Sequence, residues 1–118
     1  MHVMDYPRVY SIEYSRGAMR KLDSIHYYIE ETLGSPAAAR RVIGRIVAKI
    51  STLKENPTIG PKLSSRINTV PASFLETRFL ICDKHIVIYN MEKERVLVMA
   101  IYHTTEDVFG RVLDELDW

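Results

Sequence analysis

The sequence predicts an α+β domain in which a helical hairpin packs on one face of a twisted, mainly antiparallel sheet, in the order β-α-α-β-β-β-α. Apolar residues recur every three or four positions through residues 18–53, which is the period of one helix face. From residue 78 to residue 103, short apolar runs rich in β-branched side chains alternate with two polar breaks. Runs of this kind are typical of strands, so this region predicts a three-stranded meander.

Local signals place the two helices. The first apolar stripe ends at Gly34, a residue that commonly terminates helices. Ser35 and Pro36 then provide an N-cap and a proline for the first turn of a second helix, which ends before Pro57. The stripes consist of Ala18, Leu22, Ile25, Ile29 and Leu33, and of Ile43, Ile46, Val47, Ile50 and Leu53. With so short a break between them, the helices are expected to pack as an antiparallel hairpin.

The rest of the chain follows the same logic. Residues 57–72 hold three prolines and Gly60 among small polar residues, which predicts a long irregular connection. Asp83-Lys84 and residues 92–94 are the polar breaks that separate the three strands of the meander. Residues 104–107 have the composition of a helix start, so a closing helix is expected from Thr105 to about Leu116.

Length and composition limit the possible classes. A chain of 118 residues is expected to form a single domain over residues 1–118. Cys82 is the only cysteine, which excludes a disulfide framework and makes a reducing cytosol the natural compartment. The first residues lack the features of an export signal, and the sequence has no apolar run of membrane-spanning length. We therefore expect a cytoplasmic protein without membrane partners.

The charge pattern is uneven although the net charge is only +1. Residues 35–54 contain five basic residues and no acidic one, whereas residues 106–117 contain five acidic residues against Arg111 alone. Arg41, Arg45 and Lys49 follow a spacing of four and should line one exposed face of the second helix. This row indicates either a surface for an acidic partner or an ordinary solvated helix face.

Common catalytic and metal-binding motifs are absent from the sequence. It contains no phosphate-binding loop, no nucleophile elbow, no His-Glu-x-x-His pair and no Cys-x-x-Cys, and its four histidines lack metal-ligand spacing. We therefore expect no metal and no cofactor. His85 and His103 remain as candidates, because both lie in the meander, where neighbouring strands bring distant residues together. Histidine can act as a general acid or base near neutral pH, although a structural role is equally open.

The order of elements, the segment Asn56-Pro57-Thr58-Ile59-Gly60-Pro61 and the ending from His103 to Asp107 together resemble the RelE/ParE superfamily of bacterial toxins. The resemblance makes residues 9–14 a first strand that pairs beside the last strand. It implies the toxin of a type II toxin–antitoxin system, which causes growth arrest unless its cognate antitoxin binds it. A toxin–antitoxin hetero-oligomer is then expected, with the basic row of the second helix as a surface that attracts the antitoxin.

Two targets are consistent with this resemblance. In the branch that cleaves ribosome-bound mRNA, a histidine or tyrosine at the end of the last strand takes part in catalysis, and His103 occupies that position. Arg78, Lys84 and His85 would then stabilise the negative charge of the phosphate or assist proton transfer. In the other branch, the toxin binds and inhibits DNA gyrase without catalysis.

Departures from the mRNA-cleaving pattern favour the gyrase target. Ile86 and Asn90 stand where such relatives often carry arginines, and Glu106 stands in place of one member of a basic pair. A carboxylate at that position would repel the phosphate that a cation attracts. Inhibition of DNA gyrase is therefore the leading hypothesis, with ribosome-dependent mRNA cleavage as the alternative. A third possibility is a non-toxic binding module that retains only the fold.

Overall fold

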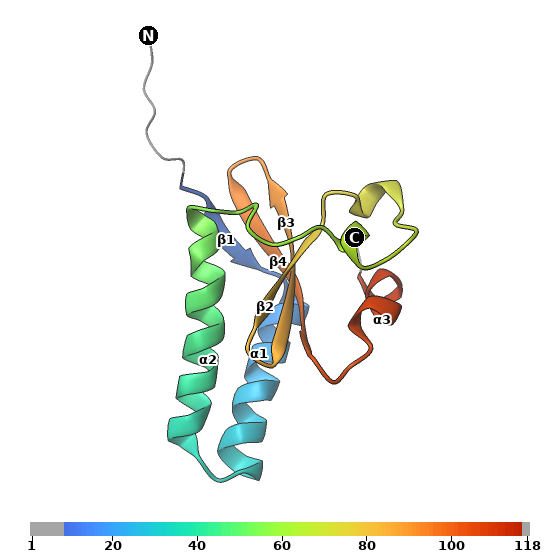
Figure 1. Cartoon of the computed structure of the whole chain (residues 1–118). Helices are drawn as coiled ribbons and strands as arrows, with labels where there is room; N and C mark the ends of the chain where they lie inside the picture. Colours follow the sequence, from blue (N-terminus) through green and yellow to red (C-terminus); the bar gives the residue numbers. More distant parts are fainter. Residues whose placement is uncertain (1–8, 117–118) are drawn as a thin grey trace.

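The computed structural model describes residues 9–116, which form a mixed four-stranded sheet with helices on both faces (Figure 1). The elements are β1 (Ser11–Tyr14), α1 (Arg16–Tyr27), α2 (Pro36–Ser51), β2 (Arg78–Cys82), β3 (His85–Glu92), β4 (Arg95–His103) and α3 (Val108–Glu115). Single helical turns occur at Tyr28–Thr32, Thr52–Lys54, Leu63–Ser65 and Ala72–Phe74. The element order agrees with the sequence prediction.

The strands are arranged in the order β1-β4-β3-β2. β1 runs parallel to β4, and the other two pairings are antiparallel. Both the mainly antiparallel sheet and the position of the first strand beside the last are thus confirmed. The first strand begins at Ser11 and not at Val9, because the Tyr10 N–H donates to the carbonyl of Lys54, at the end of the second helical segment.

Two tight turns connect the meander. β2 ends at Cys82 and β3 begins at His85, so Asp83 and Lys84 alone join them. Asp83 and, in the second turn, Lys93 have positive φ angles of 53° and 54°. Short polar residues of the aspartate type tolerate this left-handed conformation better than bulky ones. The first predicted break is the observed turn, and the second turn is one residue shorter than the predicted break, because Glu92 still belongs to β3.

Ser15 fixes the start of α1 against the sheet. Its hydroxyl accepts a hydrogen bond from the Ala18 N–H at 3.0 Å and donates to the Met99 carbonyl at 2.8 Å. Met99 lies at an irregularity of β4, where Val98 and Ala100 pair with successive residues of β3 and leave Met99 as the extra residue of a bulge. One N-cap thereby holds both the helix start and the bulge.

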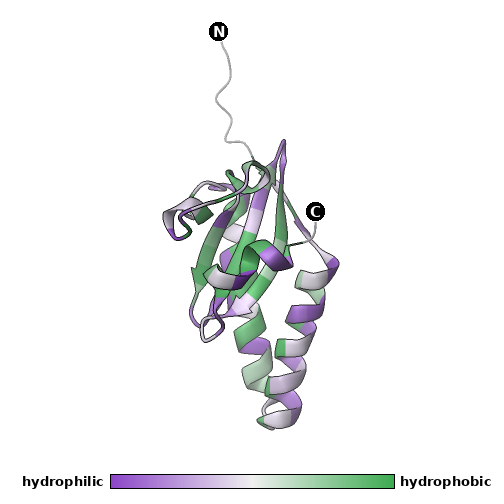
Figure 2. Ribbon diagram, turned by 90° about the vertical axis from the view of Figure 1, so that its right-hand side faces the viewer, coloured by the Kyte–Doolittle hydropathy of each residue, from purple (hydrophilic) through white to green (hydrophobic). Residues whose placement is uncertain are grey.

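The helical hairpin covers one face of the sheet, and α3 covers the other (Figure 1). The larger core, between the hairpin and the sheet, includes Ala18, Leu22, Ile46, Ile50, Leu80, Val87, Tyr89, Val96, Val98 and Ile101. The smaller core, under α3, consists of Leu63, Phe79, Ile86, Ile88, Tyr102, Val108 and Val112. Figure 2 shows the corresponding pattern, in which hydrophobic residues concentrate along the strands. Alternating strand residues therefore supply the two cores.

The connection between α2 and β2 is held by the buried Tyr89. Its hydroxyl donates to the Pro57 carbonyl at 2.7 Å and accepts from the Gly60 N–H at 3.0 Å. A side chain at Gly60 would collide with the Phe79 carbonyl oxygen and the Tyr89 ring. The Asn-Pro-x-x-Gly-Pro segment thus packs directly against the sheet.

The closing helix begins later than the sequence predicts, at Val108 and not at Thr105. Residues 104–107 form a turn in which the Glu106 N–H donates to the His103 carbonyl and the Glu106 carboxylate accepts the His103 N–H. These bonds use the polar groups that would otherwise begin the helix. No helix among residues 9–116 has the length and apolar character needed to cross a membrane.

Candidate functional site

His85 and His103 lie opposite each other where β3 begins and β4 ends. Their rings are 5.3 Å apart between centroids and nearly perpendicular, with an interplanar angle of 83°. The His103 N–H points away from β3, toward Glu106, so this is a non-hydrogen-bonded pair, the type that brings cross-strand side chains closest. The sequence placed both histidines in the meander, and the structure brings them into contact.

The two rings line a groove of about 520 Å³ between the hairpin and the end of the sheet. Its lining is mainly apolar and comes from both helices, with Ile25, Tyr28, Ile29, Leu33 and Val42. Its polar residues are Lys21, Ser24, Lys84, His85 and His103. Apolar grooves with a few convergent polar groups are the usual form of a binding site.

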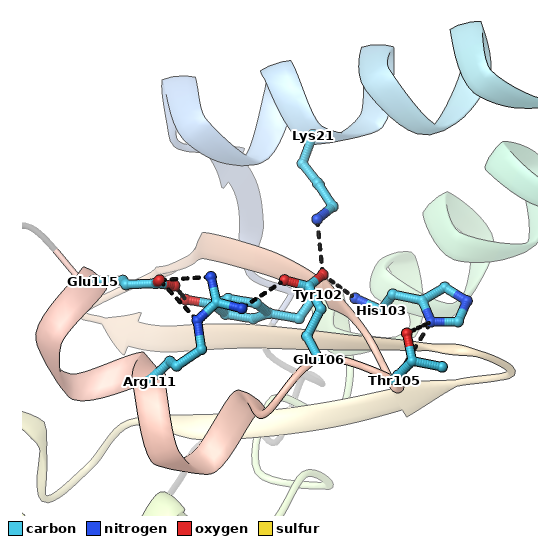
Figure 3. Close-up of polar contacts among 7 residues, drawn as sticks. All are labelled: Lys21, Tyr102, His103, Thr105, Glu106, Arg111 and Glu115. Carbon is cyan, nitrogen blue, oxygen red and sulfur yellow. Dashed lines mark hydrogen bonds and ion pairs between the residues drawn. The ribbon is translucent and has the colours of Figure 1, made fainter.

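The hydrogen bonds of His103 define which ring nitrogen carries the proton. Nδ1 accepts the Thr105 backbone N–H at 3.2 Å and lies 2.8 Å from the Thr105 hydroxyl (Figure 3). A backbone N–H can only donate, so Nδ1 is unprotonated and the neutral ring carries its proton on Nε2. In this tautomer Nε2 is a donor, and the basic nitrogen, Nδ1, is hydrogen-bonded to Thr105.

The surroundings of His85 favour its uncharged form. It is buried, and burial together with the nearby His103 and Lys21 lowers the pKa of His85 from its usual value of 6.5. Asp83 and Glu106 oppose this effect more weakly. At neutral pH the His85 ring is therefore uncharged and adds no positive charge to the groove.

Lys21 reaches the groove from α1, but Glu106 already binds it. The Lys21 ammonium lies 3.0 Å from Glu106 Oε1, the same oxygen that accepts the His103 N–H at 2.9 Å (Figure 3). The His103 N–H, followed by Lys21 and Arg111, lowers the pKa of Glu106 against the opposing effect of burial, so this carboxylate is ionised at neutral pH. Glu106 thereby neutralises Lys21, one of the two lysines that line the groove.

The same carboxylate joins α3 to this cluster. Arg111 contacts Glu106 at 3.3 Å and Glu115 at 2.7 Å, and Glu115 accepts the Tyr102 hydroxyl at 2.9 Å (Figure 3). Burial and this bond to Glu115 raise the pKa of the Tyr102 hydroxyl far above its usual value. Tyr102 is therefore a fixed hydrogen-bond donor within the fold and no source of protons at physiological pH.

The structure does not bring Arg78 to the histidines. Arg78 is the first residue of β2, whereas Cys82, the last, pairs with His85. Four residues of strand place Arg78 about 13 Å further along the sheet. Its guanidinium donates to the carbonyls of Thr58 and Gly60 at 3.1 and 2.6 Å. Lys84, in the exposed turn beside His85, is the one predicted cation that lines the groove.

Arg41, Arg45 and Lys49 are exposed on α2, as their spacing predicts. Arg45 forms an ion pair of 3.2 Å with Asp83 at the end of β2. Both side chains are largely exposed, so this pair contributes little to stability. The row lies next to β2, which is an edge strand of the sheet.

The sequence analysis missed Lys21, and it read Glu106 only as a source of repulsion. Lys21 lies between Ala18 and Leu22, two buried residues of the apolar stripe. Nothing in the sequence links it to residue 106. Within residues 9–116, no three His, Cys, Asp or Glu side chains gather so that they could hold a metal ion.

Solved structures of two bacterial toxin–antitoxin systems contain chains with this fold. The chromosomal ParDE toxin–antitoxin system of P. aeruginosa contains a chain that matches 80% of this one with a TM-score of 0.63 and 16% identity, over 96% of its own length. A chain of the Mycobacterium tuberculosis toxin–antitoxin complex RelBE2 matches 87% of this one with a TM-score of 0.58 and 15% identity, over its whole length. No curated protein sequence matches.

The family follows from the sequence itself. Residues 12–108 match the family model of the ParE toxin of the type II toxin–antitoxin system parDE. The match covers most of the chain, from β1 through the start of α3. The chain belongs to the ParE toxin family, within the RelE/ParE superfamily, as its element order and strand-end histidine suggested.

Proposed function

We propose that this protein arrests bacterial growth by binding and inhibiting DNA gyrase, without catalysis, whenever its antitoxin is absent. The observation that carries the proposal is the chemistry around His103. Its Nδ1 accepts the Thr105 N–H, and Lys21, one of the two lysines that line the groove, is paired with Glu106. Cleavage of RNA needs a base and preorganised positive charge at the phosphate, and here, among the described residues, the groove offers Lys84 alone as an unpaired lysine, with the ionised Glu106 beside His103.

A supercoiling assay with purified components tests this proposal. Relaxed plasmid, gyrase and ATP are incubated with increasing amounts of the chain. We expect loss of supercoiling, and its recovery when the antitoxin encoded beside the toxin is added first. Full supercoiling in the presence of excess, correctly folded chain would contradict the proposal.

Cleavage of ribosome-bound mRNA is the second candidate. It is supported by the contact between His85 and His103 and by Lys84 at the rim of the same groove. In this function His103 would first have to be protonated; as the imidazolium it would donate its Nε2 proton to the leaving oxygen and return to the neutral ring, and another group would have to act as the base. A non-toxic binding module is the remaining possibility, and it predicts no growth arrest at all.

The antitoxin is proposed as the physiological partner, held in a hetero-oligomer with the toxin. Arg41, Arg45 and Lys49 form an exposed cationic row that would attract an acidic segment. We predict that the double variant Arg41→Glu/Lys49→Glu slows association with the antitoxin by about tenfold at low salt, and less at 0.5 M salt. Stopped-flow association measures this. An unchanged association rate at low salt would mean that the row does not attract the antitoxin and is only a solvated surface.

A further inference from the structure

One half of the outer edge of β4 has no strand beside it. β1 pairs with β4 only from Arg95 to Val98, after which the chain turns into α1. Among the described residues 9–116, no other strand follows β1 along this edge. At the opposite edge of the sheet, the connection between α2 and β2 bonds to the start of β2. The Leu63 N–H donates to the Thr77 carbonyl, and the Phe79 N–H donates to the Pro61 carbonyl.

The open edge presents peptide groups in a defined direction. The His103 N–H points outward, to Glu106, which fixes the alternation of this part of β4. Two residues earlier, Ile101 is also in a non-hydrogen-bonded pair with β3, so its N–H and C=O point to the same side. Tyr102, between them, exchanges its hydrogen bonds with Ile86. Within residues 9–116, the N–H and the C=O of Ile101 are therefore free to bond to the backbone of an added strand.

These groups form the floor of a slot of about 510 Å³. One wall is the first part of α1, with Arg16, Gly17, Arg20 and Lys21, and the other is the end of α3, with Glu115 and Leu116. Because Gly17 has no side chain and a Cβ there would meet only the Ser15 hydroxyl at 3.9 Å, the wall of α1 is low at this point. A backbone can thus approach the floor.

The charge around the slot is unbalanced. Lys21 is paired with Glu106, and Glu115 is paired with Arg111. Arg16 and Arg20 are exposed, and neither has an ion-pair partner among the described residues. Two unpaired cations beside an open strand edge favour an extended chain that carries acidic side chains.

We propose that an extended, acidic segment of the antitoxin adds to the outer edge of β4 as a strand, in line with β1, over residues 99–102. This inference rests on the proposed toxin–antitoxin function and deepens it. Backbone hydrogen bonds to Ile101 hold the segment, and Arg16 and Arg20 bind its acidic side chains. A span of four residues corresponds to about 13 Å of strand.

Amide hydrogen exchange of the whole chain, free and in complex with the antitoxin encoded beside it, tests the strand directly. We expect the Ile101 amide to exchange at least about tenfold more slowly in the complex, because it gains a hydrogen bond. The Tyr102 amide is the internal control, since its bond to Ile86 protects it in both states. A complex that forms without any slowing at Ile101 would overturn the inference.

Two variants add an independent readout. Gly17→Leu projects a side chain into the slot and favours the helix, so it should keep the fold and weaken antitoxin binding by about tenfold or more. Arg16→Glu/Arg20→Glu should do the same, whereas Lys62→Glu/Lys93→Glu, which changes the charge equally away from the slot and from the basic row of α2, should not. Unchanged affinity in both slot variants would also overturn the inference. No antitoxin binding by the wild-type chain would instead refute the proposed function itself.

Discussion

At the scale of single residues, His103 shows how a position can be predicted while its chemistry cannot. The strand-end location follows from the apolar run that precedes it, and the contact with His85 follows from the length of the turn at Asp83 and Lys84. The protonated nitrogen depends on the Thr105 N–H, whose direction is set by a turn that replaces the expected helix start. Sequence patterns specify periodicity, and they do not specify such bonds.

The first residue-scale prediction concerns His103→Ala. If the protein acts by binding, growth arrest after induction should persist, since no proton transfer is lost. Removal of a catalytic acid or base would instead slow the chemistry by about 10²–10⁴-fold. Growth curves with matched expression measure the effect, and circular dichroism of the purified variant verifies its fold. Complete loss of arrest in a folded variant that still binds the antitoxin would favour mRNA cleavage.

A second prediction concerns Tyr89, whose buried hydroxyl bonds to the connection between α2 and β2. Tyr89→Phe removes the hydroxyl that bonds to Pro57 and Gly60 and leaves a buried carbonyl and N–H without that partner. The free energy of unfolding should fall by about 1–3 kcal/mol, measured by urea denaturation. Tyr27→Phe, at an exposed position, is the matched control and should change stability by less than about 0.5 kcal/mol. Equal effects in the two variants would mean that the Tyr89 hydroxyl does not hold the loop.

At the scale of elements, the strands and helices follow from their apolar periodicity, and the errors lie at their ends. β1 is shorter than predicted because Tyr10 bonds to Lys54, and α3 is shorter because Glu106 binds the His103 N–H. The first difference comes from a contact between segments far apart in the sequence, and the second comes from a single side-chain bond. Local composition contains no signal for either.

Glu106 gives a pH-dependent prediction for the attachment of α3. Its pKa in the folded state is lowered from 4.5, so its ionised form stabilises the fold above pH 4.5, and this contribution is lost as the pH falls through the lowered value. Glu106→Gln should therefore destabilise the protein by about 1 kcal/mol at pH 7 and by much less at pH 3.

Urea denaturation at the two pH values measures this difference, with Glu55→Gln as the control at an exposed position. The control should show no pH-dependent difference from the wild type. If Glu106→Gln has the same effect at pH 3 as at pH 7, then the charge of Glu106 does not hold α3 to α1.

At the scale of the whole molecule, the sequence predicts the class and order of elements because each element has its own apolar pattern. The position of β1 beside β4 came from the family resemblance, since a parallel pairing across two helices leaves no local trace. The groove at His103 and the slot at β4 could not be predicted from sequence, because both depend on how α1 lies across the sheet.

The central claim is that this ParE-family toxin stops DNA synthesis and does not cut mRNA. The most direct test is tightly controlled expression in a bacterial host, with labelled thymidine and methionine incorporation followed over the first minutes. We predict that thymidine incorporation falls first, while methionine incorporation continues at the rate of uninduced cells. An initial fall in methionine incorporation with continuing thymidine incorporation would contradict the account and make the groove at His103 a catalytic site.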